Sequence, residues 1–165
     1  MSALPAADPT ALAGSEKVLA NLHLAVPGVP RTFDVHDPAT GQVIAQVPDF
    51  NTHQALDAVA RADEAGRSWA ATTTRHRADI LRAWYDLIRS NAEIIALLIT
   101  REMGKPLAEA RAEVSYGADF VRWYAEEAVR PGGNLRDAPA GGARLFTRRA
   151  PVGLSVLITP WNFPL

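Results

Sequence analysis

The sequence contains no cysteine. This absence excludes disulfide bonds, zinc–thiolate sites and a cysteine nucleophile from these 165 residues. The sequence also lacks a large net charge of either sign, since 17 basic and 18 acidic residues leave a net charge of −1. Nucleic acids and anionic membrane surfaces attract strongly basic proteins, so the near-neutral balance argues against both as partners.

Long hydrophobic runs are absent as well. The longest apolar stretches, residues 94–99 and 152–158, are too short to cross a bilayer, which takes about 20 consecutive apolar residues. Residues 1–21 lack a basic segment ahead of an apolar core, so they do not resemble a signal peptide. We therefore expect a cytoplasmic protein that does not act at a membrane.

Motifs for metal and phosphate binding are scarce too. The four histidines share no ligand spacing and have no cysteine partner, so we expect no metal site. Neither Gly-x-Gly-x-x-Gly nor a Walker loop occurs in the sequence. The glycine pairs 132–133 and 141–142 lie in a loop without the strand–turn–helix context that a phosphate site requires.

The first part of the sequence predicts a β-hairpin. Residues 32–37 and 42–47 have the composition and alternation of strands, and the intervening Asp37-Pro38-Ala39-Thr40-Gly41 is typical of a turn. Proline presets φ in such a turn and glycine permits a positive φ. Upstream of the hairpin, we expect a short helix over residues 15–24.

Amphipathic helices are predicted after the hairpin, because apolar residues recur there at spacings of three and four. Ser90 and Glu93 form a capping box ahead of the third helix. The helices are expected to begin near Asn51, Thr72, Asn91 and Pro106, the last two ending at Gly104 and Arg130. The inward face of the second helix is expected to comprise Ile80, Leu81, Trp84, Leu87 and Ile88.

The C-terminal stretch predicts strands. Residues 143–149 indicate an exposed strand, and the uninterrupted apolar residues 152–159 are typical of a strand inside a parallel sheet. A parallel strand needs neighbours connected by crossovers, but the sequence supplies several helices and only half a sheet. We therefore expect the N-terminal part of a larger α/β protein.

Asn162 is the residue that points most directly to chemistry. It follows the predicted strand at its carboxyl end, where open α/β sheets bind ligands. Its side-chain NH2 group is a neutral donor, and such a donor in an apolar setting stabilises an oxyanion by about 3–4 kcal/mol. The alternative is a purely structural turn amide, with Trp161 and Phe163 packed in a core.

Other polar residues invite a simpler interpretation. Glu102 and Lys105 flank Gly104 and are interpreted as a polar helix end that glycine closes. Arg111 and Glu113 are interpreted as part of a solvated helix face.

Several segments share a family resemblance. Ile158-Thr159-Pro160-Trp161-Asn162-Phe163-Pro164 resembles the signature of the aldehyde dehydrogenase superfamily. Residues 37–41 resemble its N-terminal hairpin turn, and residues 101–110 resemble its Gly-Lys-Pro junction. Residues 116–128 are most similar to the succinate-semialdehyde dehydrogenase branch. The resemblance covers residues 33–165, and the occurrence of so many motifs in the same order argues against an accidental match.

The resemblance implies an oxidoreductase that converts an aldehyde, expected to be succinate semialdehyde, into the carboxylic acid with NAD or NADP. Asn162 matches the catalytic oxyanion-hole amide of the family. Thr159, Pro160, Trp161 and Asn162 match cofactor-binding positions, and Phe163 matches a wall of the substrate tunnel. The full-length protein is expected to be a homo-oligomer whose partner is a small-molecule aldehyde.

The resemblance also implies a division of the chain. Residues 1–31 form an N-terminal arm, and residues 32–142 the hairpin and helical part of the cofactor-binding domain. Residues 143–150 form an oligomerisation strand, and residues 151–165 the first strand of a Rossmann-like sheet with the active-site turn.

The sequence departs from the family in two ways. Residues 24–30 do not match the stretch that usually precedes the hairpin, and the family's catalytic cysteine and glutamate have no counterpart here. We therefore expect this polypeptide to be an N-terminal fragment and inactive by itself. Two alternatives stay open: another aldehyde dehydrogenase branch, or a truncated non-catalytic product that acts at most as an interaction module.

Overall fold

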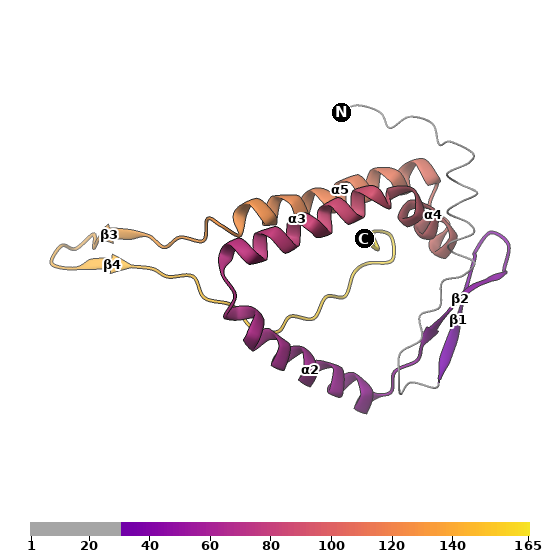
Figure 1. The fold of residues 1–165 in the computed structure, drawn as a ribbon, viewed down its shortest axis with the longest axis horizontal. Coiled ribbons are helices and arrows are strands. Elements are labelled where there is room, and N and C mark those ends of the chain that lie inside the picture. Colours follow the sequence, from indigo (N-terminus) through magenta and orange to yellow (C-terminus); the bar gives the residue numbers. More distant parts are fainter. Residues whose placement is uncertain (1–30) are drawn as a thin grey trace.

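The computed structural model describes residues 31–165. The expected helix over residues 15–24 lies outside the described residues. Helices α3 and α5 lie side by side, α4 packs at one end of them, the β1–β2 hairpin contacts α4, and α2 extends away from the other helices (Figure 1). The elements are β1 (Thr32–His36), β2 (Val43–Pro48), α2 (Thr52–Ala70), α3 (Thr74–Ser90), α4 (Ala92–Met103), α5 (Leu107–Glu127), β3 (Leu135–Asp137) and β4 (Arg144–Phe146).

The predicted β-hairpin is confirmed. Strands β1 and β2 pair antiparallel, with Phe33 opposite Val47. The Gly41 amide donates a 2.8 Å hydrogen bond to the Asp37 carbonyl, which closes the turn. Gly41 has a φ of 72°, a conformation that glycine adopts without the steric penalty of a side chain.

Asp37 fastens this turn to the helices. Its carboxylate is buried, accepts a 2.7 Å hydrogen bond from the Ala39 amide and lies 3.0 Å from a guanidinium nitrogen of Arg101 in α4. The hydrogen bond from Ala39 and then the bond from Arg101 hold the pKa of Asp37 below its ordinary value of 3.8. The ionised form of Asp37 is therefore the form that stabilises the folded chain.

This lowered pKa predicts a pH dependence of folding stability. Asp37→Asn is expected to lower the free energy of unfolding near neutral pH. The difference from the parent protein should shrink as the pH falls below 3.8, through the folded-state pKa, because the parent carboxylate then becomes protonated too. Urea unfolding across this range measures the difference. Asp86→Asn, on the exposed side of α3, controls for the change in net charge; a pH-independent difference for Asp37→Asn contradicts the prediction.

The helix ends follow local sequence signals, with one exception. Asn51 and Gln54 form a reciprocal capping box at α2, and Gly104 ends α4 with a φ of 78°. The capping box predicted for Ser90 and Glu93 is wrong. The Ser90 hydroxyl donates to the Leu87 carbonyl, while the Glu93 carboxylate accepts hydrogen bonds from Arg111 in α5. An interhelix ion pair replaces the local cap there.

Small side chains form much of the core between α3, α4 and α5. Alanines allow close approach of the helix backbones, and Val114 is fully buried among them. The predicted inward face of α3 is correct at Ile88 and wrong at Trp84, which is 54% exposed, because α5 packs along the Ile88 side. Ile80 and Leu87 are likewise exposed. The core cluster consists of Ile88, Ala96, Ile99, Ala110, Val114 and Ala118.

The two C-terminal strand predictions need correction. Residues 152–159 do not form a strand, and Ile158 is 91% exposed. A strand needs a hydrogen-bonded neighbour, and no segment within residues 31–165 pairs with these residues. The other predicted strand is present but shorter than residues 143–149, since β4 spans Arg144–Phe146. It pairs antiparallel with β3, which the sequence did not indicate, and the pair projects away from the helices (Figure 1).

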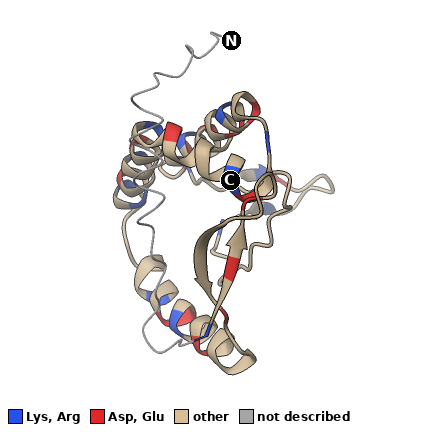
Figure 2. Cartoon of the chain, turned by 90° about the vertical axis from the view of Figure 1, so that its right-hand side faces the viewer, with Lys and Arg blue, Asp and Glu red and all other residues tan. Residues whose placement is uncertain are grey.

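Acidic and basic residues are interspersed along the helices (Figure 2). Many of them form pairs one helical turn apart, such as Arg67 with Asp63 and Arg130 with Glu127. Of the helices in residues 31–165, none combines the length and the apolar character needed to cross a membrane. The same residues include no group of histidine, aspartate and glutamate side chains suited to a metal ion.

Candidate functional site

Asn162 lies in an exposed turn that runs from Pro160 to Phe163. The Phe163 amide donates a 3.1 Å hydrogen bond to the Pro160 carbonyl, which bends the chain around Trp161 and Asn162. The Trp161 side chain is 84% exposed, and Thr159, Pro160 and Asn162 are exposed too. The five predicted site residues thus lie in sequence along one open stretch and its turn. The arrangement offers a neutral amide donor flanked by two aromatic rings.

Lys105 contacts the Asn162 turn through its ammonium group. It follows Gly104 at the end of α4 and is only 9% exposed. Its ammonium group donates a 2.5 Å hydrogen bond to the backbone carbonyl of Asn162 and lies 4.5 Å from the centroid of the Phe163 ring. A cation over an aromatic face is attracted by the ring quadrupole. The lysine therefore contacts two consecutive residues of the turn.

Glu113 completes the anchor from α5. The carboxylate is buried, with the residue 4% exposed, and its Oε2 atom accepts a hydrogen bond from the Lys105 ammonium group. Its Oε1 atom accepts a 3.1 Å hydrogen bond from the Leu165 amide. One turn further along α5, Gly117 leaves room for the Leu165 side chain, which would lie 3.0 Å from a Cβ atom at that position. The backbone from the Asn162 carbonyl to Leu165 is thus fixed to Lys105 and to α5.

The interpretation of Glu113 as part of a solvated helix face is wrong, because the residue is buried. Gly104 ends α4 as expected, but Lys105 beside it is buried too. Ala110, Val114 and Ala118 are buried on α5. Glu113 falls on this buried stripe, three residues after Ala110 and one before Val114, so helical periodicity contained a signal for its burial. No comparable signal existed for Lys105, because its partners are 8 and 57 residues away in the sequence.

Glu102 differs from Lys105 in its surroundings. Burial without a neighbouring cation raises the pKa of the Glu102 carboxyl. It contacts none of the turn residues through a hydrogen bond within the described part of the chain. We therefore keep Glu102 outside the candidate site.

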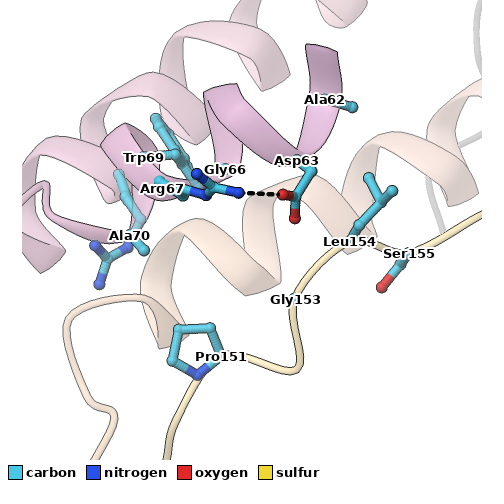
Figure 3. Close-up of a pocket in the computed structure, with 11 residues that line it drawn as sticks. Ala62, Asp63, Gly66, Arg67, Trp69, Ala70, Pro151, Gly153, Leu154 and Ser155 are labelled. Atoms are coloured by element: carbon cyan, nitrogen blue, oxygen red, sulfur yellow. Dashed lines mark hydrogen bonds and ion pairs between the residues drawn. The ribbon is translucent and has the colours of Figure 1, made fainter. Parts of the chain in front are cut away.

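A hollow of about 580 Å³ lies elsewhere, between the end of α2 and residues 151–155. Trp69, Arg67 and Asp63 line one side, with the Arg67–Asp63 ion pair across the helix surface (Figure 3). Pro151, Gly153 and Leu154 line the other side on the C-terminal segment (Figure 3). None of the five predicted site residues borders this hollow. The candidate site therefore combines the predicted turn with the buried Lys105–Glu113 ion pair that the structure adds.

The sequence and the fold were compared with known proteins. The pattern of the Aldehyde dehydrogenase family matches residues 26–165. A probable succinate-semialdehyde dehydrogenase [NADP(+)] of Sinorhizobium fredii is 42% identical over 142 residues, 86% of this chain and 29% of that protein. An aspartate-semialdehyde dehydrogenase (non-phosphorylating) of Halomonas elongata is 47% identical over 131 residues, 79% of this chain and 27% of that protein.

The fold is similar to that of a solved structure. The crystal structure of an aldehyde dehydrogenase from Brucella melitensis biovar abortus 2308 superposes with a TM-score of 0.77 at 47% sequence identity, covering 87% of this chain and 29% of that one. The chain therefore spans less than a third of the length of these relatives. Since the family pattern covers the hairpin, the helices and the Asn162 turn together, the chain belongs to the aldehyde dehydrogenase family, with the α/β fold of its N-terminal part.

Proposed function

We propose that the protein carrying this sequence oxidises an aldehyde to the carboxylic acid, with NAD or NADP as the hydride acceptor. The observation that carries the proposal is the Asn162 turn, which exposes its neutral amide while a buried ion pair holds its backbone. Family membership supplies the reaction class, and the turn supplies a group that the reaction needs.

In the proposed mechanism, Asn162 stabilises negative charge on the aldehyde oxygen. When a thiolate adds to the carbonyl carbon, the electron pair of the C=O bond moves onto oxygen. The Asn162 NH2 group donates a hydrogen bond to that oxygen and stays neutral at any working pH. These 165 residues contain no cysteine, so the thiolate belongs to residues outside this sequence.

The cofactor positions fit a large planar ligand. Thr159 and Pro160 are exposed, and the exposed Trp161 indole provides a flat apolar surface. We propose that NAD or NADP binds at Thr159, Pro160, Trp161 and Asn162. When bound, this cofactor would accept the hydride. Phe163, with its ring over the Lys105 ammonium group, would form a wall of the substrate tunnel.

We propose succinate semialdehyde as the substrate. The names of both reported relatives refer to short aldehydes with a carboxylate at the far end. In the full-length protein, kcat/KM for succinate semialdehyde is expected to exceed that for the neutral butanal at least about tenfold. NAD(P)H formation measures both rates. A preference for butanal contradicts the substrate and favours another branch of the family, and a lack of oxidation of either aldehyde contradicts the activity.

The 165-residue polypeptide alone is expected to show no dehydrogenase activity. It has no thiol to attack the aldehyde carbonyl, and Asn162 alone provides no nucleophile. The measurement is NAD(P)H production from succinate semialdehyde by purified residues 1–165, with the full-length protein as the positive control. Enzyme-dependent NAD(P)H production by the short polypeptide contradicts the proposed thiolate chemistry.

We also propose the division of the chain given above, with residues 143–150 as an oligomerisation strand in the full-length protein. The β3–β4 hairpin that contains this strand projects from the helices and is exposed along its length, which supports a contact with a second copy. Residues 152–159 would gain their strand structure from neighbours that residues 31–165 do not provide.

A further inference from the structure

We propose that Lys105 and Glu113 are positioning residues that fix the backbone of the Asn162 turn so that the amide side chain keeps one orientation. The inference rests on the proposed function, in which Asn162 donates to the substrate oxygen. It adds two residues that do not touch the substrate and that act through the turn.

Two anchors hold the backbone that follows the Asn162 side chain, one at the Asn162 carbonyl and one at Leu165. Lys105 binds the Asn162 carbonyl and the Phe163 ring. Glu113 binds the Leu165 amide. Both anchors act on the backbone or on a neighbouring ring, so neither uses the Asn162 NH2 group. The amide is held in place and remains free to donate to a ligand.

The ion pair is well suited to hold the turn rigidly. The Lys105 ammonium group has three donor directions, and the Glu113 carboxylate, the Asn162 carbonyl and the Phe163 ring face occupy them. Both side chains are buried, at 9% and 2% exposure, so water competes little for these contacts. A displaced turn would leave a buried charge with a missing partner, which disfavours alternative positions of Asn162.

Contact with the Asn162 turn distinguishes the Lys105–Glu113 ion pair from another ion pair near it. The Arg111–Glu93 ion pair also joins α4 to α5, through three hydrogen bonds, but contacts no residue of the turn. It lies on the same helix as Glu113 and provides a matched control. A variant that removes it should loosen the helices without moving Asn162.

The test compares Lys105→Met/Glu113→Gln with the control Glu93→Gln/Arg111→Met in the full-length protein. Neutralising both partners avoids leaving one charge buried alone. In the first variant, amide hydrogen exchange in residues 160–165 is expected to rise about tenfold, whereas the control should match the parent there. Unchanged exchange in residues 160–165 overturns the inference, even if the protein oxidises aldehydes. Faster exchange supports the anchoring even if no aldehyde is oxidised, so the two proposals fail separately.

Measurements of kcat test whether Lys105 and Glu113 act on the reaction through Asn162. Lys105→Met/Glu113→Gln is expected to lower kcat about 10- to 100-fold with little change in KM for the aldehyde. In an Asn162→Ala background, the same two substitutions should lower kcat by less than about twofold, because the group they position is gone. A full, additive loss in that background overturns the inference. If the double variant does not fold, Glu113→Met alone, which removes the acceptor of the Leu165 amide, should raise exchange at Leu165, and unchanged exchange there overturns the inference.

Discussion

Replacing Asn162 with alanine in the full-length protein is expected to lower kcat about 10²- to 10³-fold, which corresponds to about 2.7–4 kcal/mol of lost transition-state stabilisation. The loss falls on kcat because the amide meets full negative charge only when the carbonyl oxygen becomes an oxyanion. Steady-state NAD(P)H formation with succinate semialdehyde measures the change. KM for the aldehyde should change much less than kcat.

Asn134→Ala is the matched control for this substitution. Asn134 is exposed in the loop before β3, and its backbone pairs with Thr147 at the base of the β3–β4 hairpin. Removal of its side-chain amide should leave kcat near the parent value. Parent-like kcat in Asn162→Ala would mean that the Asn162 amide has a structural role, the alternative that the sequence left open.

Replacing Lys105 alone with methionine is expected to cost about 3–5 kcal/mol in the free energy of unfolding. The substitution leaves the buried Glu113 carboxylate without its cation, and the side chain of Glu113 is only 2% exposed. The combined Lys105→Met/Glu113→Gln variant should recover much of this loss, since the unpaired charge is then removed as well. Urea unfolding of the parent, the single variant and the double variant measures the three free energies.

Arg111→Met provides the comparison for an ion pair that is less buried. It leaves Glu93, whose side chain is 36% exposed and can be hydrated, so the loss should be smaller than for Lys105→Met. Equal losses at the two positions would contradict the claim that burial of Glu113 makes Lys105 indispensable. A double variant no more stable than Lys105→Met would contradict it as well.

The parts of the fold that the sequence predicted correctly depend on neighbouring residues. Gly41 closes the hairpin turn and Gly104 ends α4 because both backbones adopt positive φ angles that glycine favours. Asn51 caps α2 through an amide three residues away. Interactions over such short distances along the chain can be inferred from composition and spacing.

The parts that sequence analysis missed depend on distant contacts. Residues 152–159 have strand composition, but strand formation requires a partner, and composition does not provide one. Trp84 has helical spacing toward a core, yet α5 covers a different side of α3. Lys105 was interpreted as part of a polar helix end that Gly104 closes, and the sequence did not indicate that it is buried against Glu113 and Asn162. In the candidate site, the motif identified the turn but not the residues that hold it.

The most direct test of the central claim is the single-turnover rate of NAD(P)H formation from succinate semialdehyde by the full-length protein. Single turnover isolates the chemical steps from product release. We expect one NAD(P)H for each aldehyde consumed in the parent protein, and a rate about 10²- to 10³-fold lower in Asn162→Ala. Equal rates in the two proteins, or aldehyde consumption without NAD(P)H, would contradict it.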